Sequence, residues 1–307
     1  MAKHARQRLN SPGERGDLLD REEAMDFGVL MFMTDYAMPV TALAQAMEER
    51  GFESLWAPEH SHIPLSRKTP FPGGGELPKP YYDAMDPFVS LSIAAGVTKK
   101  LKIATGVCLV IQRDTILLAK TVASLDQVSG GRFLFGIGGG WNQDEMEDHG
   151  TVYATRFKKM REQVEAMREI WTKSKPEYHG DIVDFPPMMA WPKPVQNPLP
   201  VIVGGAFPHA ARRAVRYGNG WAPIAGRAPY GDINDYLPKF KAMLAEAGRK
   251  FEDVPITLMG GGEDVDILKR YRDMGVVRWV AMLPAEGADA TLPRLDRWAA
   301  IMRQVNS

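Results

Sequence analysis

Glu59, His60 and His62 are the side chains of this sequence whose types and spacing best suit acid–base chemistry. Imidazole titrates near neutral pH, so His60, with Glu59 beside it, is the preferred candidate for a proton donor or acceptor. Two histidines two positions apart on an extended chain point to the same side and could instead hold a metal ion. No other predicted strand exit supplies a third ligand, and a histidine satisfied by loop contacts is the plainer alternative. We therefore predict catalytic roles for His60 and Glu59, and no metal site.

Three consecutive glycines, Gly138 to Gly140, follow the short apolar run Phe133 to Ile137. Such a run is typical of a parallel strand buried on both faces, and glycines at its carboxyl end let the backbone approach a flat ring or a phosphate. A dinucleotide fingerprint would have glycine in place of Trp141 and a second strand ending in a carboxylate, and the sequence has neither. The three glycines could form an ordinary loop at the end of the strand. Alternatively, they could form the binding site of a flat cofactor.

Two more glycine-containing segments stand at predicted strand exits. The segment Thr105-Gly106-Val107 indicates a bulge or a close approach to something flat, or else tight packing against a neighbouring strand. The segment Gly204-Gly205-Ala206-Phe207 leads into a helix, whose N-terminus favours an anion such as phosphate, although an ordinary glycine turn has the same composition. Lysine is absent from the strand exits, which disfavours Schiff-base chemistry. The sequence thus offers glycines that could admit a planar ring, a helix N-terminus that could bind a phosphate, and an imidazole. Together these features indicate a redox enzyme with a flavin-like cofactor.

The composition fits an enzyme of small molecules. The chain has 307 residues with 38 basic and 38 acidic side chains, so its net charge gives no attraction to nucleic acid or to a membrane surface. Its single cysteine, Cys108, excludes an internal disulfide and fits a cytoplasmic location. Residues 1–24 are polar and rich in Arg and Glu, so we expect a disordered N-terminal extension, with Met25 as a candidate true start. Residues 25–307 are expected to form a single domain.

The spacing of apolar residues predicts strands that alternate with helices. The predicted strands are 26–33, 54–58, 101–110, 133–137, 201–205, 220–223, 255–259 and 276–283. The predicted helices are one after Pro39 and then 86–98, 114–128, 155–171, 209–217, 233–247, 264–274 and 292–305. Two long segments, 63–83 and 176–200, show neither period and are expected to shape the substrate pocket. This alternation predicts an α/β protein, a (β/α)8 TIM barrel with insertions at the carboxyl-end loops.

Several longer segments carry a family likeness. They are LDQVSGGRFLFGIGGGW, then NQDEMEDHG with a following helix that carries Arg156, and WPKPVQNPLPVIVGGAFPHAARRAVRYGNGWAP. Together they resemble the bacterial luciferase-like oxidoreductases, from about Met25 to at least Pro223. The segments ERGFESLWAPEHSHIP and PFPGGGELP resemble the branch that uses the deazaflavin coenzyme F420.

The resemblance implies a (β/α)8 barrel, often dimeric, with the cofactor ring across its mouth. It also implies a bulge and a non-prolyl cis peptide at the end of the third strand, here at Gly106-Val107. By the same analogy the residues Gly205 to Phe207 hold the cofactor phosphate, and His60 stands in the place of the active-site histidine of the dehydrogenase members. Four residues would flank the cofactor, namely Gly138, Gly139, Gly140 and Asn142.

These observations predict an oxidoreductase that transfers a hydride between C5 of F420 and a small organic substrate, with His60 as the proton partner. We expect a homodimer, with a flavin or F420 reductase as a further partner. An FMN-dependent monooxygenase supplied by a separate flavin reductase is the main alternative, because the same barrel accepts either ring. A flavin-binding barrel without catalysis is a third, against which His60, Glu59 and Asn142 argue. Some sugar-phosphate dehydrogenases of the family have a glutamate where this chain has Trp141, so their substrate does not carry over.

Overall fold

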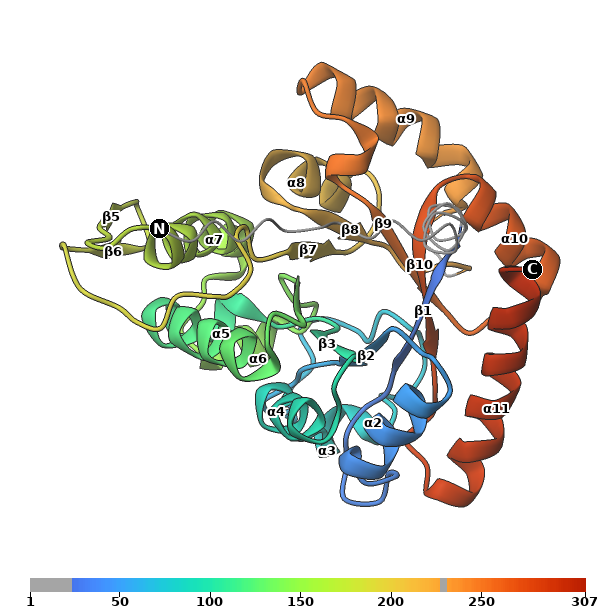
Figure 1. Ribbon diagram of the computed structural model, residues 1–307. Coiled ribbons are helices and arrows are strands. Elements are labelled where there is room, and N and C mark those ends of the chain that lie inside the picture. The colour runs from blue at the N-terminus through green and yellow to red at the C-terminus, as the bar shows by residue number, and fades with distance from the viewer. Residues whose placement is uncertain (1–23, 227–230) are drawn as a thin grey trace, which may run out of the picture.

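The structure, a computed structural model, describes residues 24–226 and 231–307 (Figure 1). Its parallel strands close into one barrel in the order β1-β10-β9-β8-β7-β4-β3-β2. The barrel strands are β1 (Asp26–Leu30), β2 (Ser54–Ala57), β3 (Lys102–Thr105), β4 (Phe133–Ile137), β7 (Val201–Gly204), β8 (Gly220–Ala222), β9 (Ile256–Gly260) and β10 (Val276–Met282). The predicted (β/α)8 TIM barrel is confirmed, and each strand begins within one residue of its predicted start. The predicted extension over residues 1–24 lies outside the described residues, apart from Ala24.

Helices surround the barrel on its outer side (Figure 1). The longer ones are α2 (Val40–Glu49), α4 (Pro87–Val97), α5 (Thr115–Ser129), α7 (Arg156–Thr172), α8 (His209–Tyr217), α9 (Ile233–Glu246), α10 (Val265–Asp273) and α11 (Ala288–Val305). The short ones are α3 (Pro80–Asp83), α6 (Gln143–Asp148) and the 3₁₀ turns η1 (Val110–Gln112), η2 (Tyr153–Thr155) and η3 (Phe251–Asp253). None of the helices in the described ranges is long and apolar enough to cross a lipid bilayer.

Short polar side chains fix where the helices around β3 and β4 begin and end. The Asp86 carboxylate accepts hydrogen bonds from two backbone N–H groups of α4, and the Asp114 carboxylate accepts one from α5. At the other end of α5, Gly130 takes the left-handed conformation with φ of 69°. A residue with a Cβ is strained there, so the predicted stop at the glycine pair is confirmed.

The two segments expected to lack regular structure each contain a small amount of it. The loop 63–83 ends in the single turn α3, which begins with Pro80. The segment 176–200 contains an antiparallel hairpin of β5 (Tyr178–His179) and β6 (Asp184–Phe185), which lies beside α7 away from the barrel strands (Figure 1). Strands of two residues are too short to show an alternating pattern, so the sequence gives no signal for them.

β3 ends five residues earlier than its predicted end at residue 110, because the chain bulges after Thr105. Ala104 pairs with Leu134, whereas the next bridge joins Cys108 to Ile137. The chain therefore uses one more residue on the β3 side than on the β4 side, which defines a bulge. The Gly106-Val107 peptide inside it is cis. Both features implied by the family resemblance are confirmed.

The barrel is filled rather than hollow. One side chain from each strand forms the interior cluster, namely Leu30, Trp56, Ala104, Leu134, Ile202, Ala222, Met259 and Val280. Trp56 is fully buried, and its Nε1 donates to Ser54 Oγ at 2.8 Å. A Cβ on Gly28 would lie 3.0 Å from Trp56 Nε1, and one on Gly136 would lie 3.3 Å from Trp56 Cζ3. These strand glycines make room for the indole, so a ligand can bind only at an end of the barrel.

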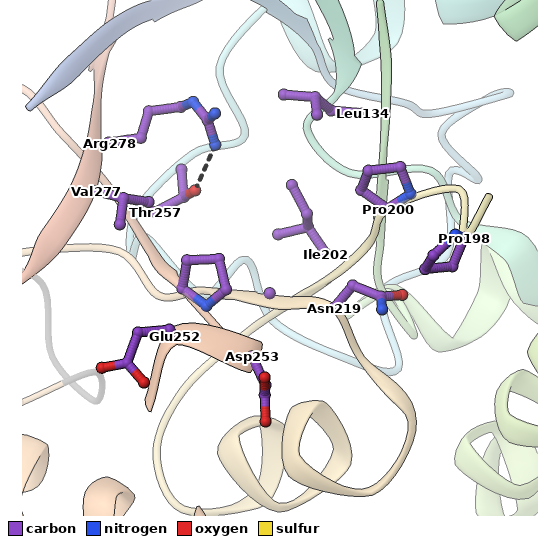
Figure 2. Close-up of a pocket in the computed structure, with 12 residues that line it drawn as sticks. Leu134, Pro198, Pro200, Ile202, Asn219, Glu252, Asp253, Thr257, Val277 and Arg278 are labelled. Atoms are coloured by element: carbon purple, nitrogen blue, oxygen red, sulfur yellow. Dashed lines mark hydrogen bonds between the residues drawn. The ribbon is translucent and has the colours of Figure 1, made fainter. Parts of the chain in front are cut away.

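An ion pair lies at the amino ends of the strands. Arg278 donates to both carboxylate oxygens of Glu53 at 2.7 Å and to Thr257 Oγ1 at 3.0 Å. Figure 2 shows the contact with Thr257 at the edge of a cavity of about 300 Å³, between the early residues of β4, β7, β9 and β10. Each guanidinium nitrogen already has a protein acceptor, and this end of such barrels usually serves stability. We therefore assign the cluster a structural role.

Candidate active site

A second cavity, of about 340 Å³, opens at the carboxyl ends of the barrel strands. Each strand contributes a residue from its last positions or its exit, namely Leu30, Pro58, Val107, Gly138, Gly204, Ala222, Met259 and Met282. The chemistry of parallel barrels sits at this end, because loops from all strands converge there. The predicted residues Glu59, His60, Gly139, Gly140, Gly205 and Ala206 line the same cavity.

The glycines at this cavity mainly accommodate protein side chains, which differs from their predicted role. A Cβ on Gly138 would lie 2.5 Å from Val107 Cγ2, and one on Gly204 would lie 2.7 Å from Val107 Cγ1. A Cβ on Gly139 would lie 2.5 Å from the ring of Phe157. Val107 therefore occupies the space between two bare strand exits and itself lines the cavity. The sequence located the converging glycines but could not show which group fills the space beside them.

Thr105 and Gly106 support the bulge from behind the cavity wall. The Thr105 side chain is buried and its hydroxyl donates to the Gly136 carbonyl at 2.7 Å. A Cβ on Gly106 would meet Leu30 at 2.9 Å and Trp56 at 3.3 Å. Of the three predicted residues in this segment, only Val107 is among the residues that line the cavity.

His60 is paired with Glu145, a residue that the sequence reading missed. His60 Nδ1 lies 2.7 Å from Glu145 Oε2, and the two side chains are 6% and 1% exposed. The other carboxylate oxygen accepts a hydrogen bond from the Ser61 backbone N–H at 3.1 Å. A carboxylate at Nδ1 holds the imidazole in one orientation and leaves Nε2 as the nitrogen available to a substrate. The arrangement is that of an oriented general base.

The Glu59 side chain binds groups other than His60. Its carboxylate accepts from the Leu109 N–H and from Arg113 Nε, each at 2.6 Å. Burial disfavours the charge on Arg113, but the attraction of Glu59 outweighs this effect and raises the pKa of Arg113. Burial, followed by the negative charge of Glu59, raises the pKa of the Cys108 thiol well above its ordinary value. Glu59 therefore fixes the chain after the β3 bulge, and its predicted pairing with His60 is replaced by that of Glu145.

The other predicted residues near His60 lie outside the cavity wall. His62 is exposed and its Nε2 lies 3.0 Å from Asp148 Oδ2. In the described part of the chain, no group of three His, Cys, Asp or Glu side chains has a geometry that could hold a metal ion. Asn142 is buried, and its side-chain oxygen accepts from the Glu145 N–H at 3.5 Å as the N-cap of α6. Its contribution is to the start of the helix that carries Glu145.

The start of α8 forms a positively charged corner of the cavity. Arg213 lines the cavity and lies 3.9 Å above the ring of Phe157, and Arg156 lies 4.3 Å above the same ring. Neither arginine forms an ion pair within the described residues, and both Nε atoms are buried without a hydrogen-bond partner. Burial, with the nearby charge of Arg156, lowers the pKa of Arg213. An anion in this corner would supply the missing charge and acceptors.

Gly205 and Ala206 lie beside this corner, whereas Phe207 does not line it. Phe207 stacks on Tyr236 at 5.6 Å and takes part in the packing of α9. The N-terminus of α8 adds backbone N–H groups and the positive end of the helix dipole near Gly205. In the sequence, Arg213 stands about one turn into the helix that follows Gly204 and Gly205. This position could have marked Arg213 as an anion-binding residue, but the prediction considered the glycines alone.

Residues 25–261 match the family described as luciferase-like monooxygenase. The chain belongs to this family. The resemblance to luciferase-like oxidoreductases is thereby confirmed. An uncharacterised protein of Mycobacterium tuberculosis (strain ATCC 25618 / H37Rv) is 36% identical to this luciferase-like chain over 285 residues, which cover 90% of the chain and 98% of that relative.

Solved structures of other proteins share the fold. The monooxygenase RslO1 from Streptomyces bottropensis superposes with a TM-score of 0.69 and 20% identity, over 92% of this chain and 98% of that one. An F420-dependent secondary alcohol dehydrogenase, in complex with an F420–acetone adduct, superposes with a TM-score of 0.68 and 18% identity, over 92% and 99%. The same barrel thus occurs in a monooxygenase and in an F420-dependent dehydrogenase.

Proposed function

We propose that this chain is a cytosolic oxidoreductase that transfers a hydride between C5 of coenzyme F420 and a small organic substrate. The observation that carries the proposal is the buried pair of His60 and Glu145 at the edge of a cavity that is also lined by Val107 and by an arginine without an ion pair, Arg213. Hydride transfer to or from an alcohol carbon needs a base or acid for the oxygen proton, and His60 provides it. The superposition on a structure named as an F420-dependent alcohol dehydrogenase supports the choice of cofactor.

The residues of the cavity fit such a cofactor. Val107 stands between Gly138 and Gly204, where it would support one face of a planar ring. Arg213 and the start of α8 would hold its phosphate, because the buried Arg213 Nε has no protein acceptor and the helix N-terminus adds a positive dipole end. When bound, F420 would supply a carbon that accepts or gives a hydride as a two-electron unit.

The protein groups move the proton. As an alcohol is oxidised, His60 Nε2 takes the proton of the hydroxyl group, and the carbon that bears this oxygen loses a hydride, which bound F420 would accept. Glu145 stabilises the positive charge that then forms on the imidazole, at 2.7 Å from Nδ1. In the reverse direction, the same nitrogen donates the proton to the oxygen of a carbonyl group.

An FMN-dependent monooxygenase supplied by a separate flavin reductase is the second candidate. The superposition with a monooxygenase over 92% of the chain favours it. FMN also has a flat ring and a phosphate, so the cavity alone does not choose between the two. A barrel that binds a flavin without catalysis has no use for a buried His60–Glu145 pair.

Titration with each cofactor tests the proposal. We expect saturable quenching of fluorescence with F420 and none with FMN. Quenching with FMN and none with F420 would exclude F420 as the cofactor. Arg213→Ala should weaken F420 binding by about 10- to 100-fold, since a charged hydrogen bond contributes about 1.5–3 kcal/mol. The matched control is Arg212→Ala, which removes an exposed neighbour on α8 and should leave the affinity unchanged. Equal losses in both variants, or binding of neither cofactor, would refute the assignment.

Gly138→Ala is expected to weaken F420 binding by about tenfold. The added Cβ would lie 2.5 Å from Val107 Cγ2 and push Val107 from its place between the strand exits. Overpacking of this kind costs about 1–3 kcal/mol. Part of this cost is expected to weaken cofactor binding, because the displaced Val107 would no longer support the ring. Gly96→Ala on α4 is the control, because a Cβ there has open space. Fluorescence titration of both variants gives the comparison, and an unchanged affinity in Gly138→Ala would show that Val107 does not support the cofactor.

We also propose that the chain forms a homodimer. Apolar side chains on adjoining helices are exposed to solvent, at 62% for Val89 and 44% for Ile93 on α4, and 66% for Leu117 on α5. A second copy related by twofold symmetry would cover such a patch with the same patch. Sedimentation should then give the mass of two chains.

A further inference from the structure

Four buried hydrogen-bond donors on α7 and α8 have no acceptor among the described residues. They are Nε of Arg156 and Nε of Arg161 on α7, and Nε of Arg213 and the hydroxyl group of Tyr217 on α8. The two helices are in contact there, because the Arg213 guanidinium lies 3.9 Å above the ring of Phe157 on α7. We call Arg156, Arg161, Arg213 and Tyr217 the α7–α8 strip.

The strip starts at the cavity and continues along the two helices. Arg213 lines the cavity, whereas Arg161 and Tyr217 do not. Tyr217 follows Arg213 by four positions, so both side chains lie on one face of α8. Burial raises the pKa of Tyr217 to about 12, and the positive charges of Arg213 and Arg161 act against this effect. The Tyr217 hydroxyl group therefore lies near one arginine from each helix and keeps its proton at neutral pH.

The carboxylates of α7 satisfy the outer part of the strip only in part. Glu165 lies 3.6 Å from Arg161 Nε, and Glu162 lies 3.8 Å from Arg161 Nη2, which is beyond the distance of a good hydrogen bond. Both carboxylates have other donors. Glu165 accepts from the Tyr178 hydroxyl group at 2.7 Å, and Glu162 accepts from the backbone N–H groups of residues 182 and 183. The Arg161 guanidinium thus keeps donors for a further acceptor.

An anion is the ligand that these donors fit. A buried hydroxyl or guanidinium N–H without an acceptor destabilises a protein, and a carboxylate or phosphate oxygen would accept from it and offset the charge of the arginines. One phosphate beside Arg213 reaches only the inner end of the strip. Tyr217 stands four residues further along α8, which corresponds to about 6 Å. The outer donors, Arg161 and Tyr217, therefore suit a second anionic group.

We propose that the outer part of the α7–α8 strip binds a second anionic group of the cofactor, a carboxylate on a tail beyond the phosphate. This inference rests on the proposed function. F420 has such a tail, in which lactate and glutamate units follow the phosphate, whereas FMN ends at its phosphate. The tail would leave the cavity beside Arg213, and its carboxylates would bind Arg161 and Tyr217. The strip has a role with F420 that it lacks with FMN.

Titration with two forms of the cofactor tests the inference. Fluorescence titration of the full chain would compare F420 with the deazaflavin 5′-phosphate, which has the same ring and a phosphate but no tail. We expect F420 to bind at least about tenfold more tightly, as a charged hydrogen bond to the tail would provide. Equal affinities would overturn the inference and leave the proposed function intact. Binding of neither form would refute the proposed function as well.

Arg161→Gln locates the contribution of the tail. This variant should weaken binding of F420 by about tenfold and leave the affinity for the tail-free form within about twofold of wild type. Lys158→Gln is the matched control on α7, because Lys158 is paired with Asp181 and points to an exposed surface. Equal losses of F420 affinity in the two variants, or an equal loss for both cofactor forms in Arg161→Gln, would contradict the inference.

Tyr217→Phe removes only the hydroxyl group that lacks a partner. In the ligand-free protein we expect an unchanged or higher melting temperature, because no hydrogen bond is lost, and a weaker affinity for F420 by about threefold to tenfold. Tyr178→Phe is the control for stability, since it removes a hydroxyl group that donates to Glu165 and should lower the melting temperature. A lower melting temperature in ligand-free Tyr217→Phe, or an unchanged F420 affinity, would refute the role of Tyr217.

Discussion

His60→Ala is expected to lower kcat by about 10²- to 10⁴-fold while the affinity for F420 stays within about twofold of wild type. The imidazole is buried beside Glu145, and in this proposal it is the group that exchanges a proton with the substrate oxygen. Without it, the proton would have to pass to water, which is a weaker base than imidazole. Single-turnover reduction of F420 separates this effect from product release. Retained turnover in His60→Ala with bound cofactor would exclude the assignment.

Glu145→Gln distinguishes the orienting carboxylate from the base itself. The amide keeps the shape of the side chain but removes the negative charge beside His60 Nδ1, so we expect a smaller loss of kcat, about tenfold, with little change in KM. Glu147→Gln is the matched control on the same helix, because Glu147 lies at the surface and pairs with Lys68. Equal kcat values in the two variants would show that Glu145 only supports the fold.

Local rules predicted the fold well because its elements are marked by nearby residues. The buried run of β4, the glycine after α5 and the helix 209–217 were predicted at their observed positions. Each depends on the chemistry of a few consecutive residues. The hairpin of β5 and β6 was missed because its strands are too short to show a pattern.

The active-site pair could not be predicted in this way. His60 and Glu145 are 85 positions apart, and only the closure of the barrel brings α6 against the exit of β2. Glu59 was chosen because it is adjacent in sequence. Successive side chains of an extended segment point to opposite sides, which is a physical reason to expect Glu59 and His60 to face different surroundings. Arg213 was overlooked for a related reason, since its lack of a partner is a property of the folded cavity.

Glu53→Gln is expected to lower the free energy of unfolding by about 3–5 kcal/mol at about pH 7. Arg278 is 7% exposed, and both Glu53 oxygens accept from its guanidinium group, so the amide would leave a buried cation without its main counter-charge. Urea denaturation followed by circular dichroism measures the change. Glu263→Gln is the control, because the exposed pair of Glu263 and Arg297 should contribute less than about 1 kcal/mol.

The effect of Glu53→Gln is expected to depend on pH. Burial opposes ionisation of Glu53, but Arg278 and Lys102 outweigh it and lower the pKa from 4.5 to about 2. A lowered pKa in the folded state means that this carboxylate stabilises the fold above its unfolded pKa, and that the stabilisation is lost as the pH falls through the folded pKa. The difference in unfolding free energy between wild type and Glu53→Gln should therefore be widest near neutral pH and should narrow between pH 4.5 and about 2. Adding Arg278→Met should restore part of the stability, because it removes the unpaired cation, and a further loss in the double variant would contradict the charge argument.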